Sequence, residues 1–357
     1  MRSAAPCATR PMRLIPLAAQ CLLLATIAFA QNSAPGAAPP PDHAAATQPA
    51  AAAPEDSASD PQPQEPAAHN EGNTFVFKKQ VEEVVLHATV FDDQRRPVTG
   101  LDRSAFSVYE DGQPQTITAF HTEDVPVAIG IVVDNSGSMR DKRDKVNQAV
   151  VNLIRASNPQ DEVFVVNFSD KSYLDQDFTS NVNLLQAALN QVCSRGSTAL
   201  YDAIVASDVH LENNPRLQKR ALLVITDGQD NMSVETLQEA SRRLQQINGP
   251  TLYAVGLLGS GLKENGRDAL QQLAEATGGA AYFPDTLDHV DNITRTVAHD
   301  IRAQYRIAYK PKKQGAKPSY QSIRVEARAP GYGPLTVRTR EGYYSPESPA
   351  TTLTKAQ

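Results

Sequence analysis

The stretch VAIGIVVDNSGSM, residues 127–139, decides the fold. Its first seven residues are apolar or glycine, and a continuous apolar run of this length predicts a strand buried on both faces of a parallel sheet. Polar and turn-forming residues follow at once, from Asp134 to Ser138. Ligands of open α/β sheets bind at the carboxyl ends of the strands, so this polar segment stands where a binding site is expected.

Three more apolar runs continue the pattern, at residues 163–168, 221–226 and 252–258. Between the runs, apolar residues recur at helical spacing, and they form two sets: Val146, Val150, Leu153 and Ile154, then Leu237, Ala240 and Leu244. Strands that alternate with helices are typical of a parallel sheet covered on both faces. The sequence therefore predicts an α/β domain with a doubly wound, mostly parallel sheet.

The segments on either side of this domain alternate with period two, which is typical of half-buried strands. Asp111-Gly112 is expected to form a hairpin turn in the first of them. We count roughly four strands before the domain and three after it, and neither set is comfortably large enough for a two-layer core. We therefore expect one β-sandwich into which the α/β domain is inserted. The alternative is a small β module before the domain and an extended hairpin after it.

The first thirty residues have the pattern of a secretion signal. Arg2, Arg10 and Arg13 precede an apolar run that ends in Ala28-Phe29-Ala30, so cleavage is expected before Gln31. A membrane anchor is the alternative, but the run is shorter than the about 20 residues that cross a bilayer. A lipid anchor on Cys21 would need a small residue where Gln20 stands.

Removal of the expected signal changes the net charge and the cysteine count of the chain. Without the signal, 31 basic residues stand against 40 acidic ones, a formal charge of −9, which argues against nucleic acid as a partner. Cys193 is then the single remaining cysteine, so no disulfide can form within the mature chain. No other stretch could span a membrane.

The expected organisation follows. The predicted parts are a signal peptide at 1–30, a disordered Ala/Pro-rich linker at 31–73, the first part of the sandwich at 74–124, the α/β domain at 125–302, the second part of the sandwich at 303–345 and a disordered tail at 346–357.

Oxygen-bearing side chains follow the strands of the predicted sheet. Asp134, Ser136 and Ser138 come after the first run, and Asp227 comes after the run at 221–226. Thr198 lies between them, in a loop that opens a helix. Each residue alone would more often cap a helix. Two carboxylates and three hydroxyls would thus converge on one rim of the sheet.

This pattern, Asp-x-Ser-x-Ser, then a Thr in a middle loop, then Thr-Asp-Gly, resembles the metal ion-dependent adhesion site of von Willebrand factor type A domains. The resemblance covers residues 125–302, about half of the chain. It implies that Ser136, Ser138 and Thr198 contact Mg²⁺ (or Mn²⁺) directly, while Asp134 and Asp227 hold it mainly through water. It also implies an open metal position that an Asp or Glu of a partner protein fills.

Neighbouring residues are interpreted differently. Asp202 is expected to be structural, and Asp230 and Asn231 are expected to lie in a solvated loop. Met139 should be a core residue beneath the site, and Cys193 a small buried residue. Gly137 and Gly196 are expected to let the loops approach closely.

The favoured function is an exported, periplasmic or secreted, non-enzymatic protein that binds a partner protein for adhesion or scaffolding. The alternative is a metal-dependent hydrolase or phosphotransferase of an α/β fold. A haloacid dehalogenase-type phosphotransferase would need a second acid where Ser136 stands, a dinucleotide enzyme would need a glycine fingerprint, and no motif surrounds any of the seven histidines. A third hypothesis is a purely structural metal site.

Overall fold

The structure is a computed structural model. It describes residues 13–14, 83–122, 124–191, 194–214, 217–257, 263–311 and 319–345, of which 13–14 are described by their backbone alone. Most of the expected signal peptide, the expected linker and tail, and Cys193 lie outside the described residues. None of the described helices is both long enough and apolar enough to cross a bilayer.

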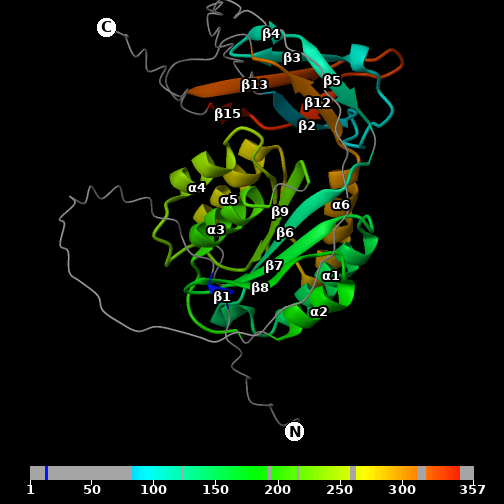
Figure 1. Cartoon of the computed structure of the whole chain (residues 1–357). Helices are drawn as coiled ribbons and strands as arrows, with labels where there is room; N and C mark the ends of the chain where they lie inside the picture. Colours follow the sequence, from blue (N-terminus) through cyan, green and yellow to red (C-terminus); the bar gives the residue numbers. More distant parts are fainter. Residues whose placement is uncertain are drawn as a thin grey trace, which may run out of the picture. The chain divides into compact units, whose positions relative to one another are not determined.

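A seven-stranded sheet forms the centre of the α/β part, with the strand order β1-β8-β7-β6-β9-β10-β11 (Figure 1). Its strands are β1 (Arg13–Leu14), β6 (Val127–Asp134), β7 (Glu162–Phe168), β8 (Ser172–Thr179), β9 (Lys219–Thr226), β10 (Thr251–Gly256) and β11 (Ala281–Tyr282). β7, β6, β9, β10 and β11 run parallel, and β8 pairs antiparallel with β7. β1 pairs antiparallel with β8. The predicted doubly wound, mostly parallel sheet is confirmed.

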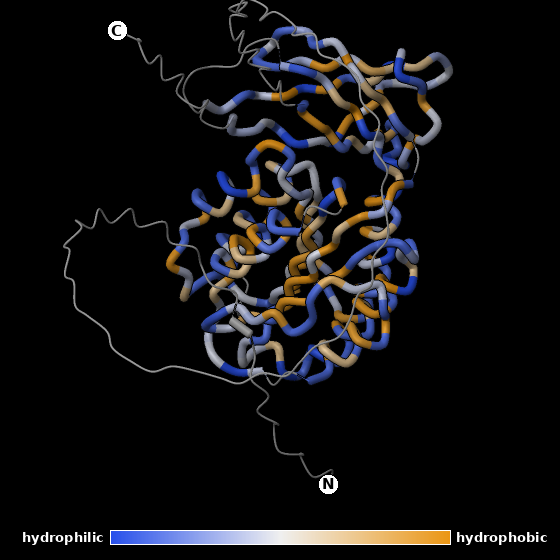
Figure 2. The backbone as a smooth tube through the Cα atoms, in the orientation of Figure 1, coloured by the Kyte–Doolittle hydropathy of each residue, from blue (hydrophilic) through white to orange (hydrophobic). Residues whose placement is uncertain are grey.

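Helices cover both faces of this sheet (Figure 1). The helices are α1 (Arg143–Ala156), α2 (Val182–Asn190), α3 (Leu200–Glu212), α4 (Leu237–Leu244), α5 (Glu264–Thr277) and α6 (Val290–Arg302). On one face α1, α2 and α6 pack against alternate strand residues such as Ile131, and on the other α3, α4 and α5 pack against Val132. Figure 2 shows the apolar residues gathered along the central strands. The two apolar faces of each strand explain why its sequence is a continuous apolar run.

The flanking segments form two antiparallel four-stranded sheets, with the orders β14-β2-β12-β5 and β15-β13-β3-β4. Their strands are β2 (Val84–Phe91), β3 (Phe106–Glu110), β4 (Gln113–Gln115), β5 (Ile117–His121), β12 (Tyr305–Tyr309), β13 (Tyr320–Ala327), β14 (Thr336–Arg338) and β15 (Gly342–Tyr344). One core joins the sheets, with Leu86 and Ile307 from the first and Val108 and Val325 from the second. The sandwich is confirmed.

Strands from before and after the α/β part are interleaved in this sandwich. β12 lies between β2 and β5, and β13 pairs with β3. The described residues contain four strands on each side of the α/β part, so the expected three after it is one too few. β15 was missed because its sequence, Gly-Tyr-Tyr, shows no apolar–polar alternation. The exact boundaries of the parts stay predictions.

The sandwich contacts the α/β part through backbone and side-chain hydrogen bonds. Asn248, in the loop before β10, accepts from the Val85 backbone N–H through Oδ1 at 3.1 Å. Arg340 donates to the carbonyls of Gln246 at 3.0 Å and Gly249 at 2.8 Å. One turn of the α/β part, residues 246–249, is thus bonded to β2 and to the loop between β14 and β15 of the sandwich.

Candidate metal centre

Asp134 ends β6 and is fully buried. Its Oδ1 accepts a hydrogen bond from the Ser136 backbone N–H at 2.7 Å, and its Oδ2 accepts one from the Thr226 hydroxyl at 2.6 Å. Burial raises the pKa of this carboxyl above its ordinary value, the two hydrogen bonds oppose that rise, and the charge of Asp227 adds to it. A buried carboxylate with a second one nearby favours a bound cation, which would stabilise both charges.

Three oxygens form a chain beside Asp134. The hydroxyls of Ser136 and Ser138 lie 3.1 Å apart, and the Ser138 hydroxyl donates to Asp227 Oδ1 at 2.7 Å. Ser136 and Asp227 are buried, whereas Ser138 is exposed. The chain of oxygens therefore has two buried ends and reaches the surface at its middle member, Ser138.

Lys142 is a member of the site that the sequence reasoning missed. Its ammonium forms an ion pair with Asp227 Oδ2, and its side chain is 21% exposed. Its position was a usable signal, because a residue four places after Ser138, at the start of a helix, lies on the same side of the turn as that serine. Thr226, which bonds Asp134, was also missed, since it reads as the last residue of an apolar strand.

Thr198 comes to the site on a loop that two glycines allow. Gly196 has a φ of +82°, and a Cβ on it would lie 2.8 Å from the Asp170 carboxylate, so glycine is required there. A Cβ on Gly228 would lie 3.1 Å from Thr198 Oγ1 and 3.7 Å from Asp134 Oδ2. Both oxygens therefore border the same small space beside the Gly228 backbone.

Glycine is less strictly required at position 137 than the sequence suggested. Its N–H donates to the Gly196 carbonyl at 3.2 Å and links the two loops. A Cβ on it would meet only that carbonyl, at 3.9 Å, which is an ordinary contact. The expectation of a close approach is therefore right for Gly196 and wrong for Gly137.

The segment after Gly228 is the partly exposed loop that we expected, with Asn231 exposed and Asp230 half-buried, and it also braces the Thr198 loop. Asn231 Oδ1 accepts from the Thr198 N–H at 3.0 Å, and the Asn231 N–H donates to the Thr198 carbonyl at 3.0 Å. Asp230 accepts from the Tyr201 N–H at 3.1 Å. The sequence did not predict these hydrogen bonds, because the partners lie about thirty positions away.

Asp202 and Met139 behave as expected. The carboxylate of Asp202 accepts from the backbone N–H groups of Val234 at 3.0 Å and Glu235 at 2.9 Å, so it ties the first turn of α3 to the loop after β9. Met139 is fully buried in the core beneath the site.

The residues brought together suit a hard divalent ion. The oxygens come from two carboxylates and three neutral hydroxyls, the kind of ligands that Mg²⁺ and Mn²⁺ take. Among the described residues there is no cluster of three or more His, Cys, Asp or Glu side chains, so a soft-metal site of that kind is not found there. In the described part of the chain, no histidine bonds any of the five residues.

Comparison with known proteins adds a family match to this geometry. Residues 129–229, which include all five predicted ligands, match the family model of the von Willebrand factor type A domain. Comparison of the sequence with curated proteins gave no match.

Several solved structures are similar to parts of the chain. Proximal thread matrix protein 1 from the mussel byssus, with a zinc-occupied MIDAS motif, is 19% identical with a TM-score of 0.44, over 54% of this chain and 50% of that one. The von Willebrand factor type A protein from Catenulispora acidiphila is 13% identical with a TM-score of 0.45, over 76% of each chain. The PilB minor pilin from Streptococcus sanguinis is 14% identical with a TM-score of 0.41, over 51% of this chain and 63% of that one.

The chain thus spans about half the length of the mussel protein. The family match lies on the central strands β6 and β9 and on the loops that follow them. The observed doubly wound sheet and the matched sequence agree on one conclusion: the α/β part of this chain is a von Willebrand factor type A domain.

Proposed function

We propose that this chain is an exported, non-enzymatic protein that binds a partner protein through a divalent cation, Mg²⁺ or Mn²⁺. Ser136, Ser138 and Thr198 would hold the cation directly, and Asp134 and Asp227 mainly through water. The bound ion would supply an electrophilic position that takes an Asp or Glu carboxylate of the partner. The protein would act in adhesion or scaffolding, in the periplasm or outside the cell.

The observation that carries the proposal is the hydrogen-bonded chain from Ser136 through Ser138 to Asp227, open to the surface at Ser138. Neutral hydroxyls leave part of a dication's charge uncompensated, so an anionic ligand from outside would be strongly bound. The buried carboxylate of Asp134 anchors the inner side. A partner carboxylate could reach the ion only at the exposed side, where the loops end.

The first experiment measures the metal by isothermal titration calorimetry on the full chain. Mg²⁺ and Mn²⁺ should bind the wild type, and Asp227→Ala should abolish the binding. Asp144→Asn is the matched control, because Asp144 is an exposed acid on α1 away from the five residues, and it should bind like the wild type. Equal binding by the wild type and by Asp227→Ala would refute the site.

The second experiment tests the partner. Envelope and secreted fractions are passed over immobilised wild type and Ser138→Ala, in Mg²⁺ and in EDTA. Proteins retained by the wild type in Mg²⁺ alone should be released by a peptide that carries an Asp and not by the same peptide with Asn. Retention that persists in EDTA would contradict a metal-mediated contact and favour a purely structural metal.

The third experiment tests the enzymatic alternative. Phosphatase, esterase and peptidase assays with added Mg²⁺ should show no turnover, because no serine of the site bonds a histidine in the described part of the chain. A reproducible turnover that Ser136→Ala abolishes would overturn the non-enzymatic function.

A further inference from the structure

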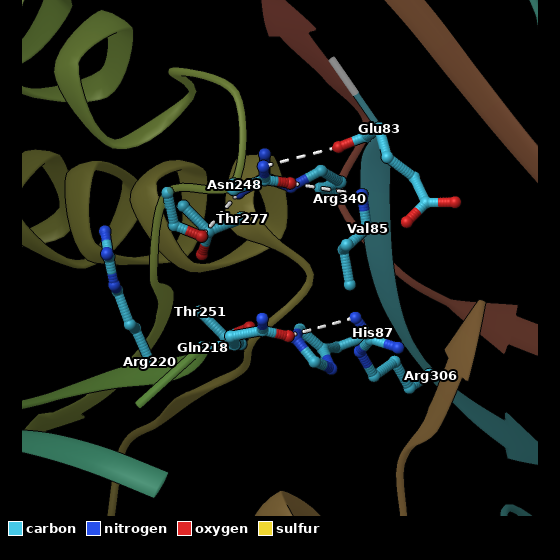
Figure 3. Close-up of a pocket in the computed structure, with 11 residues that line it drawn as sticks. Glu83, Val85, His87, Gln218, Arg220, Asn248, Thr251, Thr277, Arg306 and Arg340 are labelled. Atoms are coloured by element: carbon cyan, nitrogen blue, oxygen red, sulfur yellow. Dashed lines mark hydrogen bonds between the residues drawn. The ribbon is translucent and has the colours of Figure 1, made fainter. Parts of the chain in front are cut away.

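A second site lies between the sandwich and the α/β domain, and none of the five predicted metal ligands lines it. A cavity of about 280 Å³ opens there. Figure 3 shows Gln218, Arg220 and Thr277 on the side of the α/β domain, and His87 and Arg306 on the side of the sandwich. Arg340 and Asn248 also line it. The volume is slightly below the about 300–1,000 Å³ of pockets for drug-sized molecules, so a small ligand fits best.

Three arginines give this cavity its charge, and none of them has an ion-pair partner among the described residues. Among the described residues, the Arg220 side chain makes no hydrogen bond, and the Arg306 side chain donates only to Gln218 Oε1, at 3.1 Å. Arg340 is 5% exposed and donates only to two backbone carbonyls. Burial lowers the pKa of Arg340 to about 10, so it is still charged at neutral pH.

The acidic residues nearby are already engaged. Glu83 is the one carboxylate of the lining, and its Oε1 accepts from the Thr118 hydroxyl at 2.5 Å. In Figure 3 this carboxylate points away from Asn248. Asp208, whose charge acts on Arg220 and Arg340, bonds Arg243 at 2.8 Å instead. The guanidinium groups therefore lack a nearby carboxylate that is free to pair with them.

The pKa of the His87 ring reflects its burial and the positive charges around the cavity. Burial lowers the pKa of its ring well below the ordinary value, and the charges of Lys219, Arg340 and Arg306 lower it further. The ring is therefore neutral at pH 7. The lining then carries three positive charges and one negative charge, a net charge of about +2, which matches the about −2 of a phosphate group at this pH.

We propose that this cavity binds a small phosphate, either inorganic phosphate or the phosphate group of a small monoester. Guanidinium groups suit this ligand, because their planar N–H donors match the phosphate oxygens in pairs. Arg220 comes from β9 and Arg306 from β12, and both line the cavity, so a phosphate held by both would bridge the α/β domain and the sandwich. Binding therefore stabilises the contact between them.

The test measures phosphate binding to the full chain in EDTA, so that the metal centre is empty, and at constant ionic strength set with chloride. Inorganic phosphate should bind saturably and raise the Tm of the wild type. Arg220→Gln and Arg306→Gln should each weaken binding at least tenfold, and the double variant should abolish it. These two arginines are chosen over Arg340 because Arg340 also holds backbone carbonyls.

Two controls separate this site from general charge effects and from the metal centre. Arg324→Gln removes an exposed arginine that already pairs with Glu326, and it should bind phosphate like the wild type. Asp227→Ala should also bind like the wild type, so failure of the metal proposal would leave this result intact. The His87 ring resonances should shift on addition of phosphate to the wild type and stay unchanged in the double variant.

The comparison of ligands distinguishes the sources. Phosphoserine that binds more tightly than inorganic phosphate would assign the site to a monoester, and the reverse order would assign it to the free ion. Acetate at the same ionic strength should be at least tenfold weaker than either. An equal Tm response of the wild type and the double variant to phosphate, or acetate binding as tight as phosphate, would overturn the proposal.

Discussion

The ammonium of Lys142 forms an ion pair with Asp227 Oδ2, while Asp227 Oδ1 accepts a hydrogen bond from the Ser138 hydroxyl. One carboxylate thus serves both a lysine and a predicted metal-binding hydroxyl. A dication that approaches Asp227 meets this fixed positive charge. Lys142 is therefore expected to set the strength of metal binding without being a ligand itself.

The first prediction follows from that repulsion. Lys142→Met should tighten Mg²⁺ and Mn²⁺ binding by about tenfold, because it removes a like charge a few ångströms from the ion, an effect of about 1.4 kcal/mol. Isothermal titration calorimetry at low ionic strength measures it. Lys145→Met is the control, since Lys145 lies on the same helix and pairs with the exposed Asp288. Weaker or unchanged affinity in Lys142→Met would show that the lysine does not oppose the metal.

The second prediction separates structural from metal-binding roles at the site. Asp134→Ala should lower the free energy of unfolding without metal by about 1–3 kcal/mol. The change removes the side-chain acceptor of the Ser136 N–H and leaves the Thr226 hydroxyl with only the Gly228 carbonyl, at 3.2 Å. Ser138→Ala should lower the free energy of unfolding by less than about 1 kcal/mol, because Ser138 is exposed. Urea denaturation in EDTA measures both values. Similar losses in the two variants would contradict the view that only Asp134 supports the apo fold.

The third prediction concerns the backbone of the Thr198 loop. Gly196→Ala should destabilise the domain by about 1–2 kcal/mol and weaken metal binding, since it places a Cβ against Asp170 at a positive φ. Gly137→Ala should change the free energy of unfolding by less than about 0.5 kcal/mol, because its Cβ would make only an ordinary contact. Thermal or urea unfolding of the two variants gives the comparison. A larger loss of unfolding free energy in Gly137→Ala than in Gly196→Ala would contradict this prediction.

The fourth prediction concerns pH. Lys219 is buried and donates to the Ile301 carbonyl, and burial lowers its pKa from 10.5 to about 8. Arg302 adds to the decrease, whereas Asp124, Asp300 and Asp161 oppose it. Between these two pKa values the unfolded chain binds more protons than the folded chain, so Lys219 should make stability rise with pH across this range.

The measurement compares the free energy of unfolding of the wild type and of Lys219→Met from pH 7 to pH 10. The wild type should gain stability relative to the variant as the pH rises above about 8. The free energy of unfolding of Lys145→Met, which removes an exposed lysine, should change with pH in the same way as that of the wild type. Parallel curves for the wild type and Lys219→Met would show that the buried amine is not responsible.

The sequence predicted the centre of the α/β domain well because that part is buried on both faces. Val132 packs on one side of β6 and Ile131 on the other, so the run had to be apolar throughout. β8 was not predicted, because it is not buried on both faces. It lies next to the edge of the sheet, and polar residues such as Asp175 and Gln176 interrupt any alternation.

The ligand positions could be predicted from the sequence because four of the five directly follow strands or sit within five residues of a strand end. Their surroundings could not. Asn231 reaches Thr198 across thirty-three positions, and Lys142 reaches Asp227 across eighty-five. Such contacts depend on the folded path of the chain, and a local pattern carries no information about them. The assignment of the five residues as ligands stays a prediction for the metal titrations.

The interleaving of β12 between β2 and β5 has a consequence for the order of events during synthesis. When the ribosome has released β2 and β5, the strand that joins them does not yet exist, and about 180 residues must still be translated. The α/β domain can complete its own sheet in that interval, whereas the earlier strands must wait with unpaired edges. Nascent chains that stop before β12 should therefore be the most prone to aggregate and to recruit chaperones, although they already contain a finished α/β domain.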